Sequence, residues 1–411
     1  MRDLIYQRLL TTLLRNLDSF SDKPADAVDN SRLYESANIA AITRFVRCQD
    51  VLQLVFAHER PCASPLPTRR TRSARSADAL DMLSIPKELL TTLQVLMAPI
   101  LLDLSTKFTM YNFPSSRQAV YGTAERHPIF GGCHGLDINM DWVLHHINFW
   151  RYHMLRESEH TLFHAYEDLE PDERPRFWSS QLKQGRGDSL GTHWKGSYSY
   201  LDRSVISTVR ENGEELDPDE FNGDEHHGTG SFQDLRLDLV PGADPAQWPA
   251  IFEDFLHSLS APRSRAKTRA QIRTPDPESI AAHRPQNFQF TGEGRDITEE
   301  FYAQGWLNAL PPQHGVPGWQ RMTMMKYFQD DDIGEIDYEA LWAYEGIVLP
   351  GGQIILGRYV CWLSSCRLKF RTDFTYRWWS PGDGTGETQY SGPFILWNVD
   401  GPRHNDAEKA G

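Results

Sequence analysis

Two patterns of apolar and polar positions divide the chain. Over the first hundred residues, apolar side chains recur every three or four positions, which predicts helices at the start of the chain, at 37–56 and at 88–104. Pro99 predicts a kink or an end in the last of these helices, because proline cannot donate the backbone hydrogen bond. From Gly191 onward the period changes to two, which is typical of strands.

Strand signals recur at least seven times between residues 190 and 400. They lie at 191–200, 232–240, 287–291, 319–328, in a hairpin over 338–359 that turns at 350–352, and at 389–400. Closure into an antiparallel barrel leaves no unpaired edge strand. The pattern therefore predicts a mainly β, lipocalin-like barrel over 186–402, a helical N-terminal region over 1–185 and a disordered tail over 403–411. A barrel of about eight strands is wide enough for one small ligand.

The predicted hairpin places one acidic residue among aromatic ones. Period two puts Trp342, Tyr344 and Gly346 on one face of the strand and Glu345 on the other. We predict that Tyr344 faces the barrel interior, where a gap beside Gly346 accepts a flat ring, and that Glu345 faces the N-terminal helices. A carboxylate in such a strand is paired or functional. Glu345 therefore either pairs with an arginine such as Arg358 or contributes to a pocket.

The net charge and the cysteine content indicate which kinds of partner and which cellular compartment to expect. A net charge of -14 gives little support for nucleic-acid binding. Basic stretches near 60–80 and 261–275 are interpreted as solvated linkers, with a nuclear-localisation signal as the alternative for the first. Five cysteines without a CxxC pair favour free thiols in a reducing compartment. Arg2, Asp3 and Arg8 interrupt the apolar run of a signal peptide or membrane span, so we expect a soluble, cytoplasmic protein.

Histidines recur between residues 137 and 169, where the pattern predicts one long helix. His146, His153 and His160 are spaced by seven residues, and His164 follows four residues later. A metal site is one interpretation, and packing against the neighbouring aromatic residues is the other. The sequence HTLFH lacks the glutamate of the zinc-protease motif, and the chain contains no GxGxxG, P-loop or GxSxG motif. We therefore predict neither a metal nor a cofactor.

The candidate site consists of polar and aromatic residues on the predicted strands, because acid–base chemistry and substrate positioning remain when no cofactor is used. Twelve tryptophans favour a pocket for flat, apolar substrates. The residues predicted to be catalytic are Tyr344, His193, Lys195 and Arg358. The residues predicted to bind substrate are Trp194, Tyr198, Tyr200, Trp319, Arg321, Trp342, Glu345 and Trp397. Lys326 is a further polar candidate on the same strands.

Four segments resemble a group of fungal barrel proteins: GTHWKGSYSYLD, ITEEFYAQGWLNALPPQHGVPGWQRMTMMKYF, LWAYEGIVLPGGQIILGRY and SGPFILWNVD. Some members are associated with F-box proteins, and others are hetero-Diels–Alderases of tropolonic sesquiterpenoid biosynthesis. GTHWKG is also similar to the G-x-W start of lipocalin strands. The resemblance, which covers about residues 190–400, implies a cofactor-free enzyme of fungal secondary metabolism. Such an enzyme dehydrates a hydroxymethyl-tropolone or phenol to a quinone methide and joins it to a humulene-type alkene.

The chain departs from the group's pattern LPGGxIxxGR(Y/W)W(S/D)P at one place. Residues 360–377 separate GRY from WWSP at 378–381, which resembles an insertion or a retained intron. Two other functions stay open. The chain is alternatively a substrate receptor of a ubiquitin ligase, although residues 1–20 lack an LPxE-type F-box opening, or a carrier of a small apolar ligand.

Overall fold

The structure, a computed structural model, describes residues 87–96, 113–132, 135–155, 160–175, 190–201, 203–212, 225–226, 232–240, 287–295, 300–329, 336, 341–362 and 391–400. The predictions for the first 86 residues, for the basic stretch at 261–275 and for the tail lie outside this part of the chain. The same holds for most of the insertion predicted at 360–377. Its first three residues continue strand β10.

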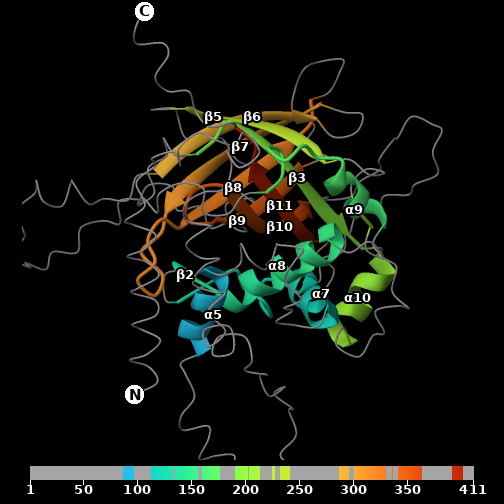
Figure 1. Ribbon diagram of the computed structural model, residues 1–411, viewed down its shortest axis with the longest axis vertical. Coiled ribbons are helices and arrows are strands. Elements are labelled where there is room, and N and C mark those ends of the chain that lie inside the picture. The colour runs from blue at the N-terminus through green and yellow to red at the C-terminus, as the bar shows by residue number, and fades with distance from the viewer. Residues whose placement is uncertain are drawn as a thin grey trace, which may run out of the picture.

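The described helices form a layer on one side of the strands (Figure 1). They are α5 (Lys87–Leu96), α7 (Phe113–Tyr121), α8 (Met140–Leu155), α9 (His160–Glu167) and α10 (Arg203–Asn212). Helix α5 ends three residues before Pro99, as a proline in this position favours. The prediction of one long helix over 137–169 was wrong, because α8 and α9 are separate helices.

Eight antiparallel strands close into a barrel, which confirms the predicted mainly β, lipocalin-like fold. Each strand pairs with the next, and β11 returns to pair with β3. Their bounds are β3 (His193–Tyr200), β5 (Gln233–Val240), β6 (Asn287–Arg295), β7 (Glu300–Ala309), β8 (Gln320–Tyr327), β9 (Leu341–Val348), β10 (Ile354–Trp362) and β11 (Ser391–Asn398). Outside the barrel, β4 (Glu225–His226) pairs with the end of β3, and β1 (Phe130–Gly131) pairs with β2 (Asp137–Ile138).

The turn of the β9–β10 hairpin is the one predicted from Pro350-Gly351-Gly352. Gly351 and Gly352 have φ angles of 96° and 68°, a region that residues with a Cβ rarely adopt. The Leu349 amide donates to the Ile354 carbonyl over 2.9 Å and closes the turn. The prediction of a tight turn here is confirmed.

The barrel interior is a single cluster of buried side chains to which all eight strands contribute. Tyr344 belongs to this cluster, whereas Ile347 belongs to the core shared with the helices. Neighbouring strand residues point to opposite faces, so Tyr344 faces inward and Glu345 outward, as predicted. The predicted gap beside Gly346 was wrong. A Cβ on Gly346 would lie 3.0 Å from a ring carbon of Phe394, which fills that space.

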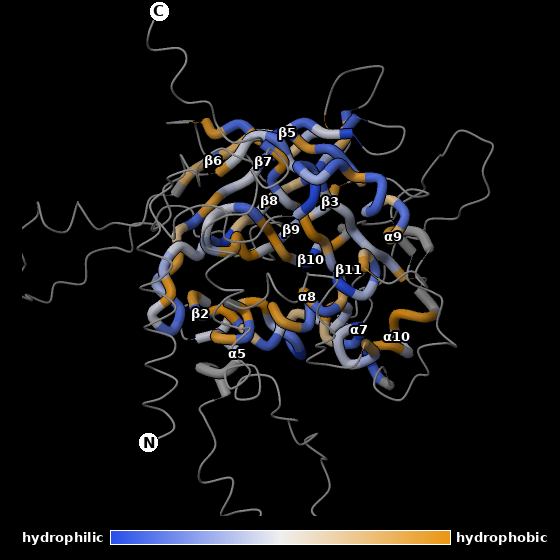
Figure 2. The backbone as a smooth tube through the Cα atoms, in the orientation of Figure 1, coloured by the Kyte–Doolittle hydropathy of each residue, from blue (hydrophilic) through white to orange (hydrophobic). Residues whose placement is uncertain are grey.

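A second core lies between the outer face of the barrel and the helices. Ile347, Leu356 and Ile395 of the strands pack there with α8, whose Trp142 and Phe149 are fully buried. Apolar and polar positions are interleaved along both the strands and α8 (Figure 2). The hairpin β9–β10 therefore has a buried face on each side, one in the barrel and one beneath α8.

Candidate functional site

The twelve predicted site residues lie in three different places. Five inward-facing residues contribute to the barrel interior: Trp194, Tyr198, Tyr200, Trp342 and Tyr344. Five others lie on the outer side of the barrel, toward the helices: Trp319, Arg321, Glu345, Arg358 and Trp397. The remaining two, His193 and Lys195, lie on the outer face at the start of β3. The four residues predicted to be catalytic therefore do not form one site, since Tyr344 and Arg358 point to opposite sides of the barrel wall.

One end of the barrel carries aromatic rings around a lysine. At this end β3 and β8 finish and β7 and β9 begin. We call this set of residues the barrel mouth: Tyr198, Tyr200, Phe301, Lys326, Phe328 and Trp342. The rings of Tyr200, Phe328 and Trp342 are half-buried, whereas Lys326 is only 3% exposed. A lysine this deeply buried requires compensation for its lost hydration.

Aromatic faces supply part of that compensation. The Lys326 Nζ lies 4.0 Å from the ring centre of Phe301, 5.3 Å from that of Tyr198 and 5.5 Å from that of Phe328. The negative face of each ring attracts the ammonium group. The inward positions of the described strands include no aspartate or glutamate, and Lys326 is their single charged residue.

Aromatic rings in edge-to-face and tilted contact form a floor beneath the mouth. Tyr359 lies 5.5 Å from both Tyr198 and Trp342 and 5.9 Å from Tyr344, measured between ring centres. Its hydroxyl donates to the Ser199 carbonyl over 2.9 Å. Gly392 of the intervening strand makes this possible, because a Cβ there would lie 2.7 Å from the Tyr359 hydroxyl. The floor is therefore fixed in position by packing and by a buried hydrogen bond.

A second polar group lies between α8 and the outer face of the barrel. We call it the wall cluster: His127, Trp142, His146, Arg321, Glu345 and Arg358. Arg321 Nη2 donates to Glu345 Oε1, so the carboxylate has the basic partner that the sequence predicts. That partner is Arg321 rather than Arg358, although Arg358 lies directly opposite Glu345 in the strand pairing. Arg358 Nη2 instead donates to the His127 carbonyl over 2.8 Å.

Burial sets the protonation states in the wall cluster. Desolvation, together with the nearby Arg358, lowers the pKa of His146 to about 3. The carbonyl oxygens of Phe394 and Gly357 oppose this shift, but neither ring nitrogen makes a well-aligned hydrogen bond with a described residue. Desolvation also lowers the pKa of Arg358 to about 10, against the attraction of Glu345. At neutral pH His146 is therefore neutral and Arg358 is charged.

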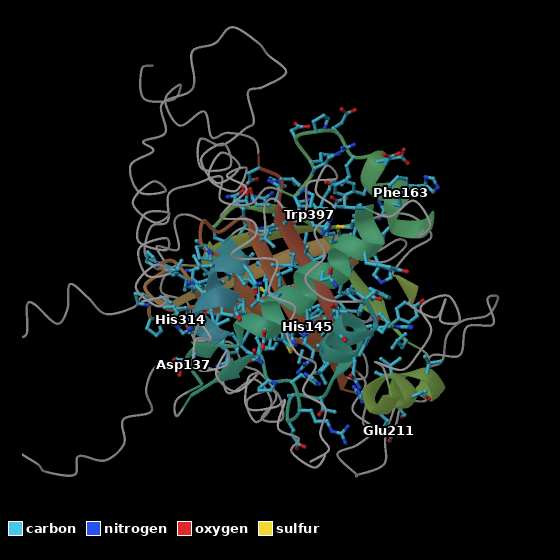
Figure 3. All side chains as sticks on the ribbon, turned by 60° about the horizontal axis from the view of Figure 1, so that its bottom comes forward. Asp137, His145, Phe163, Glu211, His314 and Trp397 are labelled. Carbon is cyan, nitrogen blue, oxygen red and sulfur yellow. The ribbon has the colours of Figure 1, made fainter. Side chains whose placement is uncertain are left out.

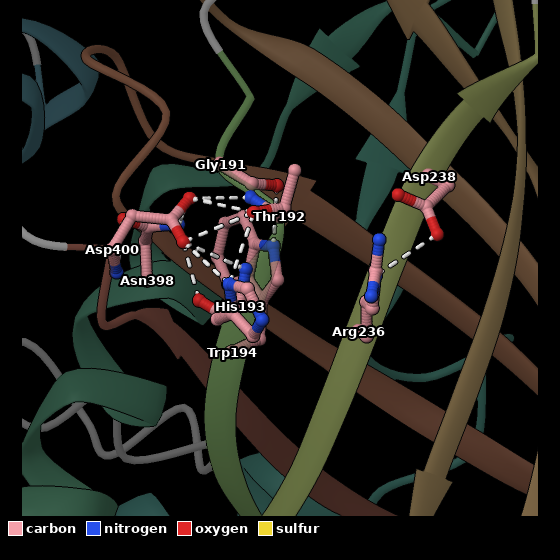
Figure 4. Close-up of polar contacts among 8 residues, drawn as sticks. All are labelled: Gly191, Thr192, His193, Trp194, Arg236, Asp238, Asn398 and Asp400. Carbon is pink, nitrogen blue, oxygen red and sulfur yellow. Dashed lines mark hydrogen bonds and ion pairs between the residues drawn. The ribbon is translucent and has the colours of Figure 1, made fainter. Parts of the chain in front are cut away.

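Asp400, which follows β11, is hydrogen-bonded to residues at the start of β3, as the close-up shows (Figure 4). The carboxylate accepts hydrogen bonds from the backbone amides of Thr192 and His193 and from the Asn398 side chain. Burial alone would raise the pKa of Asp400, but these hydrogen bonds lower it to about 2. His193 Nδ1 lies 2.9 Å from the same carboxylate. His193 therefore takes part in the contact that closes the barrel.

Lys195 forms ion pairs with two acidic side chains. Its Nζ lies 2.8 Å from Asp234 and 3.4 Å from Glu173 on the outer face of the barrel. Burial lowers the pKa of Lys195, but the two carboxylates outweigh it and the pKa is raised. An open groove of about 670 Å³ runs past this position and is lined by side chains of both charges. Most of its charged lining lies on the outer face of the barrel, and Phe301 of the barrel mouth also borders it.

The remaining outward residues anchor other segments. Trp397 Nε1 donates to the Glu173 carbonyl over 2.7 Å, and Trp319 is fully buried in the core shared with the helices. Figure 3 shows Trp397 on the strands and His145 and Phe163 on helices α8 and α9. Neither tryptophan reaches the barrel mouth, so their predicted substrate contacts lack geometric support.

The predicted histidine series is divided between two helices. His146 and His153 are buried on α8, whereas His164 is exposed on α9. Among the described residues, no group of three His, Cys, Asp or Glu side chains is arranged to hold a metal ion. The side chain of His160 lies outside the described part of the chain.

Comparison of the chain with protein-family models, with curated proteins and with solved structures finds no match. No helix in the described residues is long and apolar enough to span a membrane. The function must therefore be inferred from the chemistry of the barrel mouth and the wall cluster.

Proposed function

We propose that the chain is an enzyme of secondary metabolism that works at the barrel mouth. It dehydrates a hydroxymethyl-tropolone or a related phenol to a quinone methide and joins the product to a humulene-type alkene by hetero-Diels–Alder addition. The observation that carries this proposal is Lys326, the single charged residue among the inward positions of the described strands, held against the rings of Phe301, Tyr198 and Phe328. In this proposal the chain's own residues carry the reaction.

The dehydration step suits a lysine in an aromatic pocket. The ring hydroxyl of the substrate loses its proton, the bond between the hydroxymethyl carbon and its oxygen breaks, and the departing hydroxide takes a proton to leave as water. The ammonium group of Lys326 stabilises the negative charge on the ring oxygen as its proton departs. Because the mouth is apolar, this interaction is stronger than it would be in water.

The addition step requires positioning. The methylene carbon and the ring oxygen of the quinone methide form one C–C and one C–O bond with the alkene, and no atom is lost. Flat rings at Trp342, Tyr200 and Phe328 offer apolar surface to both reactants at the entrance. Holding two reactants in a reactive orientation contributes up to about 7–11 kcal/mol in well-oriented reactions.

A ligand carrier is the second candidate, because the closed, lipocalin-like barrel with an aromatic entrance also suits binding alone. A carrier would release the same phenol unchanged. The ubiquitin-ligase receptor remains an alternative from the sequence, and the residues on which it depends lie outside the described part of the chain.

The test is an incubation of the purified full-length protein with a hydroxymethyl-tropolone and humulene, with the adduct measured by liquid chromatography and mass spectrometry. We expect the wild type to accelerate adduct formation, and Lys326→Met to reduce it by about 100-fold or more. Lys195→Met is the matched control, because Lys195 lies on the outer face, and it should retain wild-type activity.

Two results would count against the proposal. Tight binding of the phenol without any adduct would favour the carrier. Equal activity of wild type and Lys326→Met would remove the barrel mouth from the reaction.

A further inference from the structure

The wall cluster contains more hydrogen-bond donors than acceptors. Arg358 Nε and Trp142 Nε1 are N–H groups that only donate, and both nitrogens of the His146 ring are likewise buried. None of these atoms makes a well-aligned hydrogen bond with a described residue, although the carbonyl oxygens of Phe394 and Gly357 lie close enough to the His146 ring to raise its pKa. Buried polar groups in proteins are almost always hydrogen-bonded, so an excess of buried donors at one place points to an acceptor that is not part of these elements.

The three side chains are neighbours. The rings of Trp142 and His146 lie 4.1 Å apart, and the Arg358 guanidinium carbon lies 5.7 Å from the Trp142 ring centre. Trp142 and His146 come from α8, one helical turn apart, and Arg358 comes from β10. All three side chains are at least nine-tenths buried. The donors therefore gather where the helical layer meets the barrel wall.

The charges at this interface also favour an anion. Among the described residues, Glu345 is the single carboxylate that shifts the pKa of Arg358, and it accepts a hydrogen bond from Arg321. The positive charge of Arg210 lowers the pKa of Arg358, and that of Arg126 lowers the pKa of His127. Arg358 therefore shares this carboxylate with Arg321, and an anion beside Arg358 would be attracted by its positive charge.

We propose that the wall cluster is a binding site for a small carboxylate anion, held by Arg358, Trp142 and His146. A carboxylate supplies several acceptor sites and one negative charge, which suit the buried donors and the charge of Arg358. Binding there joins α8 to β10 through the anion and stabilises the helical layer on the barrel. The site lies outside the barrel and does not depend on the reaction proposed at the mouth.

The test is thermal unfolding of the full-length protein in a carboxylate-free buffer at constant ionic strength, titrated with acetate or with its neutral isostere acetamide. Acetate should raise the Tm by several degrees along a saturable curve, and acetamide should leave the Tm unchanged. A rise that does not saturate, or an equal rise with acetamide, would reflect a general solute effect and overturn the proposal.

Variants locate the effect. Arg358→Gln should abolish the response to acetate, whereas Arg236→Gln should retain it, because Arg236 is exposed and pairs with Asp238 elsewhere on the barrel. If Arg358→Gln does not fold, Trp142→Phe removes one donor, keeps an aromatic ring and should weaken acetate binding several-fold. If Arg358→Gln or Trp142→Phe folds and still binds acetate with the wild-type affinity, the proposal is contradicted. Lys326→Met should respond as the wild type does, which separates this site from the barrel mouth.

Discussion

The two faces of the β9–β10 hairpin are both buried, yet they differ in chemistry. On the inner face, Gly357 and Gly346 make room for the ring of Phe394, and Tyr344 packs against the same ring. On the outer face, Glu345 and Arg358 lie opposite each other beneath α8. Tight packing of side chains therefore stabilises the inner face, and interactions of charged groups stabilise the outer face. This difference predicts that substitutions on the inner face act through packing, whereas those on the outer face act through charge and hydration.

The largest effect is expected at Gly357. A Cβ at this position would lie 2.3 Å from a Phe394 ring carbon and 2.4 Å from the Glu345 carbonyl oxygen, and the backbone oxygen cannot move aside. Gly357→Ala should lower the free energy of unfolding by more than about 3 kcal/mol or prevent folding. Gly131→Ala is the control, because its nearest contact is 3.9 Å away, and it should be nearly neutral in chemical denaturation.

The outer face should instead respond to pH. Because the pKa of His146 is about 3 in the folded protein, the unfolded chain takes up the proton first as the pH falls below about 6.5. The contribution of His146 is therefore present above pH 6.5 and declines between 6.5 and 3, by about 2 kcal/mol at pH 5. His146→Gln should reduce this pH dependence, and the exposed control His164→Gln should not. Identical pH profiles for wild type and His146→Gln would contradict the assigned burial.

A smaller and opposite pair of effects is expected at neighbouring positions. Glu345→Gln weakens the pairing with Arg321, and since Glu345 is 23% exposed the loss in stability should be about 1 kcal/mol. Tyr344→Phe keeps the ring in the floor beneath the mouth, so the Tm should change little. Turnover should fall because the variant lacks the hydroxyl of a residue that the sequence predicts to be catalytic. Chemical denaturation measures the stability of both variants, and the adduct assay measures their turnover. A stable, inactive Glu345→Gln variant with a fully active Tyr344→Phe variant would move the chemistry to the outer face.

The hairpin was predictable because its signals are local. Pro350-Gly351-Gly352 specifies the turn, and period two on the first strand separates Tyr344 from Glu345. Strand β7 was missed although its inward positions alternate, because Tyr302 and Trp306 on its outer face hide the contrast between apolar and polar positions. All eight residues of β8 are buried, so no alternation singled out Lys326 as an inward charge.

The composition of the two polar sites depends on contacts between distant segments. The partner of Glu345 follows from the pairing of β8 with β9, and a strand sequence does not specify its neighbour's register. His146 and Trp142 face the barrel wall because α8 docks there. The seven-residue spacing predicts that His146 and His153 share a face of one helix, but not what that face contacts.

The most direct test of the barrel mouth as the reaction site is covalent trapping of the quinone methide. In the absence of an alkene, the Lys326 ammonium group transfers a proton to the ring oxygen, which restores the phenol, and the resulting amine nitrogen forms a bond to the methylene carbon. Peptide mass spectrometry then identifies the modified residue. We predict a single major adduct on Lys326, in the peptide that contains Gln320–Tyr327. Modification of His127 or His146 instead, with Lys326 intact, would place the reaction beneath α8 and contradict the account.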